Sequence, residues 1–284
     1  MSLGAIDVLF HPTSRSRSEA CHPAPVSDHE MDHLGVACAL VSQCKKWSCE
    51  RQWMCVDTRL EDVLRYIEGS SRYLGLAGYN PFDIADSLRE IEFAVTALQF
   101  RGVYLHAASF GLPLTDERMY PLFAKAAELG VSALVQVDSG ERINARHELD
   151  RLAKDFPELT VVLAQPRPSA AEMMAIAGDC ENACFALDAG ALAYLAQQSS
   201  AGALTGGPGH TLFFHSEVFE QRCMWGSNGM EWFKALRACD PLPLTPDARL
   251  NFLRYNAARA FNLEHTPSRR TPDSIPHELM IAER

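Results

Sequence analysis

Short apolar runs alternate along most of the chain with stretches in which apolar residues recur three or four positions apart. The short runs are bounded by polar or glycine positions, which is typical of strands buried on both faces of a parallel sheet. Eight such runs predict strands at residues 5–10, 36–41, 73–79, 102–106, 133–137, 160–164, 184–188 and 223–227. This alternation favours parallel strands joined by crossover helices.

The stretches between the runs predict the crossover helices. The clearest helical patterns cover residues 83–98, 117–129, 145–155 and 170–177. Eight strands with interleaved helices favour a closed barrel over an open doubly wound sheet, and no dinucleotide or P-loop glycine motif follows any strand. The sequence therefore predicts an α/β chain with a single-domain TIM-type (β/α)8 barrel over residues 1–264. A polar tail, extended or disordered, is expected over residues 265–284.

Composition and charge narrow the range of partners. Hydrophobic residues make up 47% of the 284 residues, and 26 Lys and Arg against 36 Asp and Glu give a formal charge of -10. This charge repels phosphate backbones and anionic membranes, so neither nucleic acid nor a membrane is an expected partner. No apolar run approaches the roughly 20 residues of a membrane helix. We expect a cytoplasmic protein that binds a small molecule, and the pattern leaves open a homo-oligomer.

The cysteines do not show the spacing of a metal knuckle. There are nine, an odd number that is typical of reduced thiols in a reducing compartment. Cys38, Cys44, Cys49 and Cys55 lie within 18 residues, but none of the gaps is the two-residue gap of most structural zinc sites. Cys38 is expected to pack in a strand. The segment 44–55, which contains two tryptophans, is expected to be a loop that could contact a partner.

Polar residues stand where the predicted strands end, which is where barrels of this type carry their chemistry. These residues are Asp7, His11, His106, Gln136, Asp138, Gln165, Arg167, Asp188 and Asn228. Strand ends also meet solvent, so any one of these side chains could instead be an ordinary polar residue at the barrel rim.

Six segments, taken in order, resemble the amidohydrolase-related family, in the branch that contains aminocarboxymuconate-semialdehyde decarboxylase and pyrone-dicarboxylate lactonase. The segments are IDVLFHP (6–12), FRGVYLH (100–106), YPLFAKAAELG (120–130), LAKDFPEL (152–159), WGSN (225–228) and NAARAFNL (256–263). The resemblance covers residues 6–263 and implies a (β/α) barrel. Residues 13–53 match the family poorly.

The resemblance also implies a set of metal ligands, most of which this chain replaces. The family has His-x-His after the first strand, a histidine at the end of the fifth and of the sixth, and an aspartate after the eighth. The corresponding positions here are Leu9, His11, Gln136, Gln165 and Asn228. Leucine and neutral amides are poor ligands for a zinc-like ion, and an amide cannot take a proton from water. We therefore expect neither a catalytic metal nor another cofactor.

The first hypothesis is a metal-independent hydrolase or decarboxylase that acts on a small carboxylated molecule. The lactonase type within the resembling branch is understood to hydrolyse its substrate without a metal. The candidate catalytic residues are His11, His106, Asp138 and Asp188, with a histidine as general acid or base and an aspartate to orient it. The candidate substrate-binding residues are Gln136, Gln165, Arg167 and Asn228.

Two other interpretations stay open. The chain could be an inactive relative that binds a small ligand or a protein partner through the inherited mouth or through segment 44–55. Alternatively, a metal could bind through a different set, such as His11, His106 and Asp138 with a cysteine.

Overall fold

The computed structural model describes residues 4–11, 26–45, 58–137, 145–164, 169–204 and 211–263. It contains eight strands: β1 (Ala5–Phe10), β2 (Val36–Ser42), β3 (Tyr73–Gly78), β4 (Gly102–His106), β5 (Ser132–Gln136), β6 (Val161–Ala164), β7 (Ala183–Leu187) and β8 (Cys223–Trp225). Each strand pairs in parallel with the next one along the chain, so the sheet order is the sequence order.

The first and last strands close the ring through contacts just beyond β8. The backbone N–H of Asn228 donates to the carbonyl of Leu9 at 3.0 Å. The backbone N–H of Ser227 donates to the Asp7 carboxylate at 2.8 Å. A side chain at Gly226 would overlap with Leu9, since its Cβ would lie 2.6 Å from the Leu9 Cβ. These contacts complete the predicted (β/α)8 barrel, which is confirmed.

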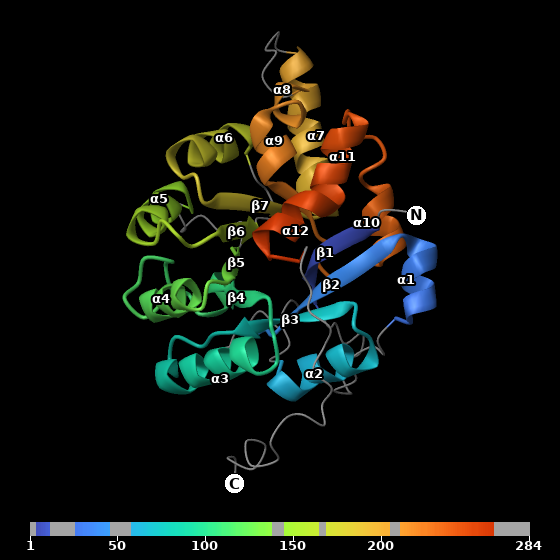
Figure 1. Cartoon of the computed structure of the whole chain (residues 1–284). Helices are drawn as coiled ribbons and strands as arrows, with labels where there is room; N and C mark the ends of the chain where they lie inside the picture. Colours follow the sequence, from blue (N-terminus) through green and yellow to red (C-terminus); the bar gives the residue numbers. More distant parts are fainter. Residues whose placement is uncertain are drawn as a thin grey trace.

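The helices lie around the outside of the strands (Figure 1). They are α1 (Asp28–Leu34), α2 (Leu60–Gly69), α3 (Ile84–Thr96), α4 (Tyr120–Glu128), α5 (Ala145–Asp155), α6 (Ala170–Asp179), α7 (Ala189–Leu204), α8 (Thr211–Phe214), α9 (Glu217–Arg222), α10 (Trp232–Arg237), α11 (Pro246–Leu250) and α12 (Asn256–Ala260). A π-helical turn, Asn251–Tyr255, joins α11 to α12. No helix in the ranges given above is long and apolar enough to cross a membrane.

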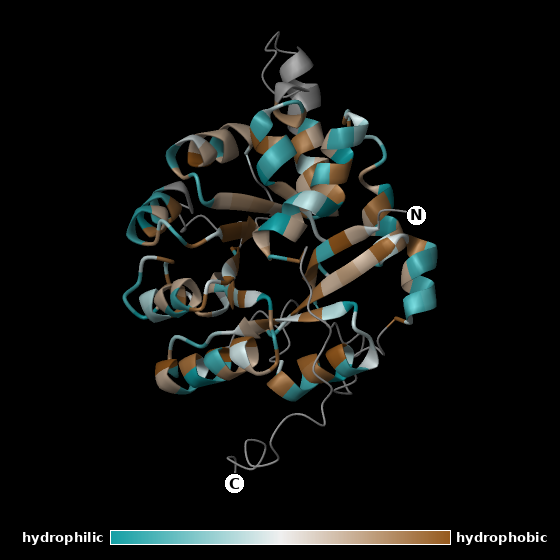
Figure 2. Cartoon of the chain, viewed as in Figure 1, coloured by the Kyte–Doolittle hydropathy of each residue, from teal (hydrophilic) through white to brown (hydrophobic). Residues whose placement is uncertain are grey.

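Buried apolar residues form two clusters, one inside the barrel and one between the strands and the helices, and Figure 2 shows hydrophobic positions along the strands. The inner cluster takes at least one buried residue from every strand, among them Ile6, Leu40, Leu76, Tyr104, Leu134, Val162, Ala186 and Met224. Ala257, Ala258 and Phe261, in and after α12, belong to the same cluster. Because side chains alternate along a strand, positions two residues further on face the same interior.

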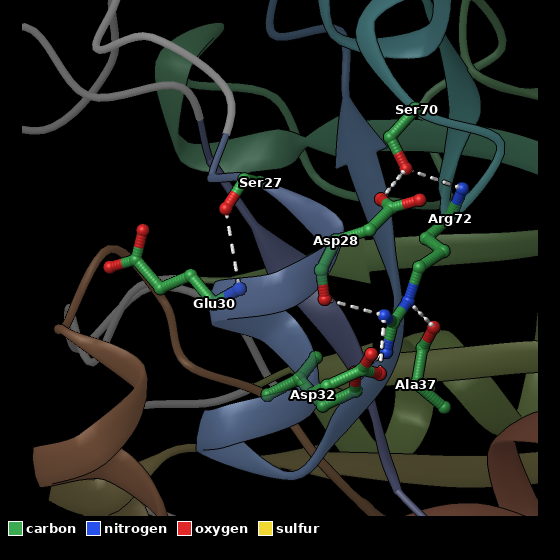
Figure 3. A network of polar contacts seen from close by, with 8 residues as sticks. Ser27, Asp28, Glu30, Asp32, Ala37, Ser70 and Arg72 are labelled. Carbon is green, nitrogen blue, oxygen red and sulfur yellow. Dashed lines mark hydrogen bonds and ion pairs between the residues drawn. The ribbon is translucent and has the colours of Figure 1, made fainter.

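Arg72 ties α1 to the start of the sheet (Figure 3). Its guanidinium donates to the carbonyl oxygens of Ala37 at 2.8 Å and Asp28 at 2.9 Å, and to the Asp32 carboxylate at 2.7 Å. Ser70 donates to the Asp28 carboxylate and accepts from the Arg72 backbone N–H. Four of these five hydrogen bonds involve a charged group, which makes them stronger than neutral hydrogen bonds. They hold a short polar helix that local propensity alone would leave unstable.

Candidate functional site

Polar side chains replace the apolar inner cluster where the strands end. Gln136 lies two residues after the inward-facing Leu134, and Asp188 lies two residues after Ala186. Asn228 lies four residues after Met224, and His11 directly follows β1. The carboxyl ends of parallel strands lie at the same end of a barrel. These four residues, at or after the ends of four different strands, therefore lie at the same opening, the mouth.

Three of these side chains and Tyr104 form a continuous hydrogen-bonded chain across the mouth, which we call the mouth network: Tyr104, Gln136, Asn228 and Asp188. The Tyr104 hydroxyl donates to Gln136 Oε1 at 2.7 Å. Gln136 Nε2 donates to Asn228 Oδ1 at 3.4 Å, a weaker link. Asn228 Nδ2 donates to Asp188 Oδ2 at 2.6 Å, which completes the connection between β4, β5 and the residues after β7 and β8.

His11 lies against one end of the mouth network. Its ring centroid is 5.4 Å from that of Tyr104, with the planes inclined by 59°. The residue is half-buried, and its Nε2 atom lies in the buried part of the ring. The structure thus places an imidazole next to the mouth network.

His106, the second candidate base, ends β4 and is buried, with 6% of its surface exposed. Its Nδ1 lies 2.5 Å from the Ser109 hydroxyl, in the 3-10 turn that follows the strand. The structure thus places His106 beside a turn residue and places His11 beside the mouth network.

Asp188 has two partners with different roles. Its Oδ2 accepts from Asn228, and its Oδ1 accepts from the backbone N–H of Ala191 at 2.7 Å. The second contact satisfies a backbone donor in the first turn of α7, as N-terminal capping residues do. One carboxylate therefore fixes both the start of a helix and the orientation of the Asn228 amide.

Asp7 is fully buried and fastens the frame around the mouth. Its Oδ1 accepts from the backbone N–H groups of Leu9 at 3.0 Å and Ser227 at 2.8 Å, and its Oδ2 accepts from Trp232 Nε1 at 2.6 Å. Burial raises the pKa of the Asp7 carboxyl, and these donors counteract part of the rise. All its contacts are internal, so Asp7 holds the backbone that carries His11 and Asn228.

Two polar groups near the mouth were absent from the sequence-based predictions. Tyr104 was missed although it lies two residues before His106 and thus on the same face of β4. Gln43, fully buried just after β2, accepts from the Gly78 backbone N–H at 2.8 Å and donates to Glu90. Glu90 also pairs with Lys45 at 3.0 Å. Strand alternation places Tyr104 on the inner face of β4 but does not predict its contact with Gln136, and nothing local identifies Gln43.

Three predicted site residues, Asp138, Gln165 and Arg167, lie outside the described residues. Most of segment 44–55, with its two tryptophans, and the tail from residue 264 onward lie outside them as well.

At the described positions that the family resemblance equates with metal ligands, the side chains do not fit a divalent transition metal. The Leu9 side chain offers no donor atom, and Gln136 and Asn228 are hydrogen-bonded to each other and to their neighbours in the mouth network. Across the described ranges, no three His, Cys, Asp or Glu side chains are grouped to hold an ion. His11 is the one imidazole at these positions, and zinc-like ions need several nitrogen, thiolate or carboxylate ligands.

Three cysteines of the described residues pack in or against the apolar clusters. Burial raises the pKa of the Cys38 thiol to about 12, that of Cys184 to about 11 and that of Cys239 to about 12. These thiols therefore stay protonated near neutral pH and pack as small apolar side chains.

Solved structures with the same fold share little sequence with the chain. 5-Carboxyvanillate decarboxylase from Sphingomonas paucimobilis matches with a TM-score of 0.56 and 18% identity, over 92% of this chain and 99% of that one. A hydrolase assigned to 2-pyrone-4,6-dicarboxylic acid from Pseudomonas putida matches with a TM-score of 0.56 and 17% identity, over 93% and 99%. A dihydroxybenzoic acid decarboxylase from Polaromonas, with bound manganese and 2-nitroresorcinol, gives 0.59 and 12%, over 93% and 98%.

At these identities the structural likeness establishes the fold alone. No curated protein matches the chain. The sequence model of the amidohydrolase family matches residues 52–263, about three quarters of the chain, which includes α2 to α12 and the strands from β3 to β8. The chain therefore belongs to the amidohydrolase family.

Proposed function

We propose that the barrel mouth binds a small carboxylated molecule and catalyses its hydrolysis or decarboxylation without a transition metal, with His11 as general acid or base. The observation that carries this proposal is the mouth network beside His11. It joins the amides of Gln136 and Asn228, which stand at two of the positions that the family resemblance equates with metal ligands, to the carboxylate of Asp188. His106, Asp138, Gln165 and Arg167 are proposed as further residues of the same site.

The two amides have donor capacity left for a ligand. An amide nitrogen carries two N–H groups, and each nitrogen donates once within the mouth network, from Gln136 to Asn228 and from Asn228 to Asp188. The second N–H of each amide is suited to a carboxylate or ester oxygen. Tyr104 and Asp188 fix the two ends of the network, so the donors are held in place before a ligand arrives.

The chemistry then depends on one titratable ring. Hydrolysis requires a base that takes a proton from water, and decarboxylation of an aromatic acid requires an acid that delivers a proton to carbon. An imidazole with a pKa near neutrality can do either. The three structures compared above are named for action on a carboxylated aromatic ring, a dihydroxybenzoic acid or a pyrone dicarboxylate, which supports this substrate class.

Turnover should survive removal of metal. We expect the chelator-dialysed protein, with its metal content checked by elemental analysis, to convert at least one of 5-carboxyvanillate, 2,6-dihydroxybenzoate and 2-pyrone-4,6-dicarboxylate, followed by ultraviolet absorbance. Added Mn²⁺ or Zn²⁺ should not increase the rate. A rate that requires the ion would contradict the proposal and favour a site at His11, His106 and Asp138. Saturable binding without turnover would favour the inactive, ligand-binding relative.

Gln136→Leu should weaken binding of the carboxylated ligand by about tenfold, because it removes one hydrogen bond and leaves the Tyr104 hydroxyl without its acceptor. Isothermal titration calorimetry on the metal-free protein measures the change. Gln221→Leu is the matched control, since Gln221 is exposed on α9 and its side-chain amide donates to Glu217 on the same helix. Equal affinity in wild type and Gln136→Leu would remove Gln136 from the binding site.

A further inference from the structure

A cavity of about 740 Å³ lies at the end of the barrel opposite the mouth. Its walls come from the first residues of β2 and β3, from the segment before β4, and from the π-helical turn and α12. Parallel strands all begin at this end, so the cavity shares no lining residue with the mouth network. Its volume is within the range of small-molecule sites, roughly 300 to 1,000 Å³.

The polar wall of the cavity is basic. Arg72, Arg101 and Arg254 line it, and no aspartate or glutamate is among the described residues of its lining. All three guanidinium groups are close enough to the Cys38 thiol to lower its pKa. Burial has the larger effect and raises that pKa. A chain with a formal charge of -10 thus concentrates positive charge at one cavity.

These arginines differ in how far their charge is already balanced. Arg72 pairs with the Asp32 carboxylate at 2.7 Å. Arg254 donates to the carbonyl of Gly4 at 2.8 Å, and neither it nor Arg101 has an acidic partner among the described residues. Within that same part of the chain, Arg101 Nε is buried without a hydrogen-bond partner. A buried charged donor without an acceptor is costly, and an anion in the cavity would supply that acceptor.

The remaining walls suit a ligand with an apolar part. Leu74, Leu98 and Leu263 line the cavity together with Tyr73. Gln99 also lines it, at a φ of 60° where glycine would be less strained, so the chain keeps an amide side chain at this wall. We propose that the cavity is a second binding site, for a small organic anion that carries a phosphate or carboxylate group on an apolar body, held by Arg101 and Arg254.

The test is calorimetric titration of the full chain at constant ionic strength with phenyl phosphate, benzoate and inorganic phosphate. We expect phenyl phosphate or benzoate to bind, and the tighter of the two identifies the acid group. Inorganic phosphate should bind more weakly because it lacks the apolar part. Arg101→Gln should weaken that binding about tenfold or more, as expected for loss of a charged hydrogen bond. Arg101→Lys, which retains the charge, should recover part of the affinity.

Arg65→Gln is the matched control, because Arg65 is exposed on α2 and pairs there with Asp62. Gln136→Leu, which weakens binding at the mouth, separates the two sites and should leave binding at the cavity unchanged, because Gln136 does not line the cavity. Circular dichroism confirms that each variant is folded. Unchanged affinity in Arg101→Gln, loss of binding in Gln136→Leu, or no saturable binding of phenyl phosphate and benzoate would overturn the proposal.

Hydrogen–deuterium exchange on the wild type also shows whether the anion binds in the cavity or at the mouth, and it needs no variant. The bound anion should slow exchange in peptides that cover residues 71–75, 98–102 and 251–258. Protection at residues 132–137 and 226–230 in place of these would assign the anion to the mouth and overturn the proposal.

Discussion

Asp7→Asn should lower the free energy of unfolding by about 3 kcal/mol, the cost of leaving buried donors unsatisfied. The Asp7 carboxylate accepts three N–H groups, two on Oδ1 and one on Oδ2. Asparagine has the same shape, but its NH2 group must face either the Trp232 indole N–H or the backbone N–H groups of Leu9 and Ser227. Either orientation brings donors together inside the barrel wall.

Urea denaturation followed by far-ultraviolet circular dichroism measures this effect, and the slope m shows whether unfolding stays two-state. Asp86→Asn is the matched control. Asp86 is exposed on α3, where it pairs with Arg89, and a surface pair of this kind contributes about 0.5 kcal/mol or less. Equal stability of Asp7→Asn and the wild type would show that the three contacts do not hold the frame.

His11→Asn should reduce kcat by about 10²- to 10⁴-fold, the range that a positioned acid or base contributes. Asparagine keeps a polar side chain beside Tyr104 but has no group that titrates near neutrality. Because the variant removes proton transfer and retains the mouth network, KM should change little. Steady-state kinetics on whichever substrate the metal-free protein converts gives both constants.

The same kinetics on two other histidine variants decides the assignment. His33→Asn is the control, because His33 is exposed on α1, a helix that contains none of the mouth residues. His106→Asn tests the second candidate. If it lowers kcat more than His11→Asn does, the acid or base is His106, and the contact of His11 with Tyr104 is packing.

The strands could be predicted closely from the sequence because parallel strands buried on both faces are unbroken apolar runs. The run predicted at 133–137 forms β5 at Ser132–Gln136, one residue earlier. The run at 223–227 ends sooner, at Trp225, because Gly226 and Ser227 turn towards β1 and Asn228 adopts a φ of 49°. That turn depends on a contact with Leu9, which no local pattern contains.

The candidate site could be predicted in part. The rule that polar residues collect at strand ends identified Gln136, Asp188 and Asn228, and the structure joins all three. It could not identify Tyr104, which pairs with Leu134 in the sheet but whose long side chain reaches Gln136 one layer further along. Such a partner depends on the register between strands and on side-chain length, and a single run of sequence specifies neither.

The closure of the barrel has a consequence for how the chain folds. The contact that joins Ser227 to Asp7 spans 220 residues, and the inner cluster is complete only when Met224 meets Ile6. Such a topology has high contact order, which slows folding because the entropy of loop closure is lost before the long-range contacts form. During synthesis, β1 must wait with one edge unpaired until β8 has left the ribosome. That edge can meanwhile pair with strands of other chains. Conditions that slow translation should therefore promote aggregation of the nascent chain, while the folded protein stays unaffected.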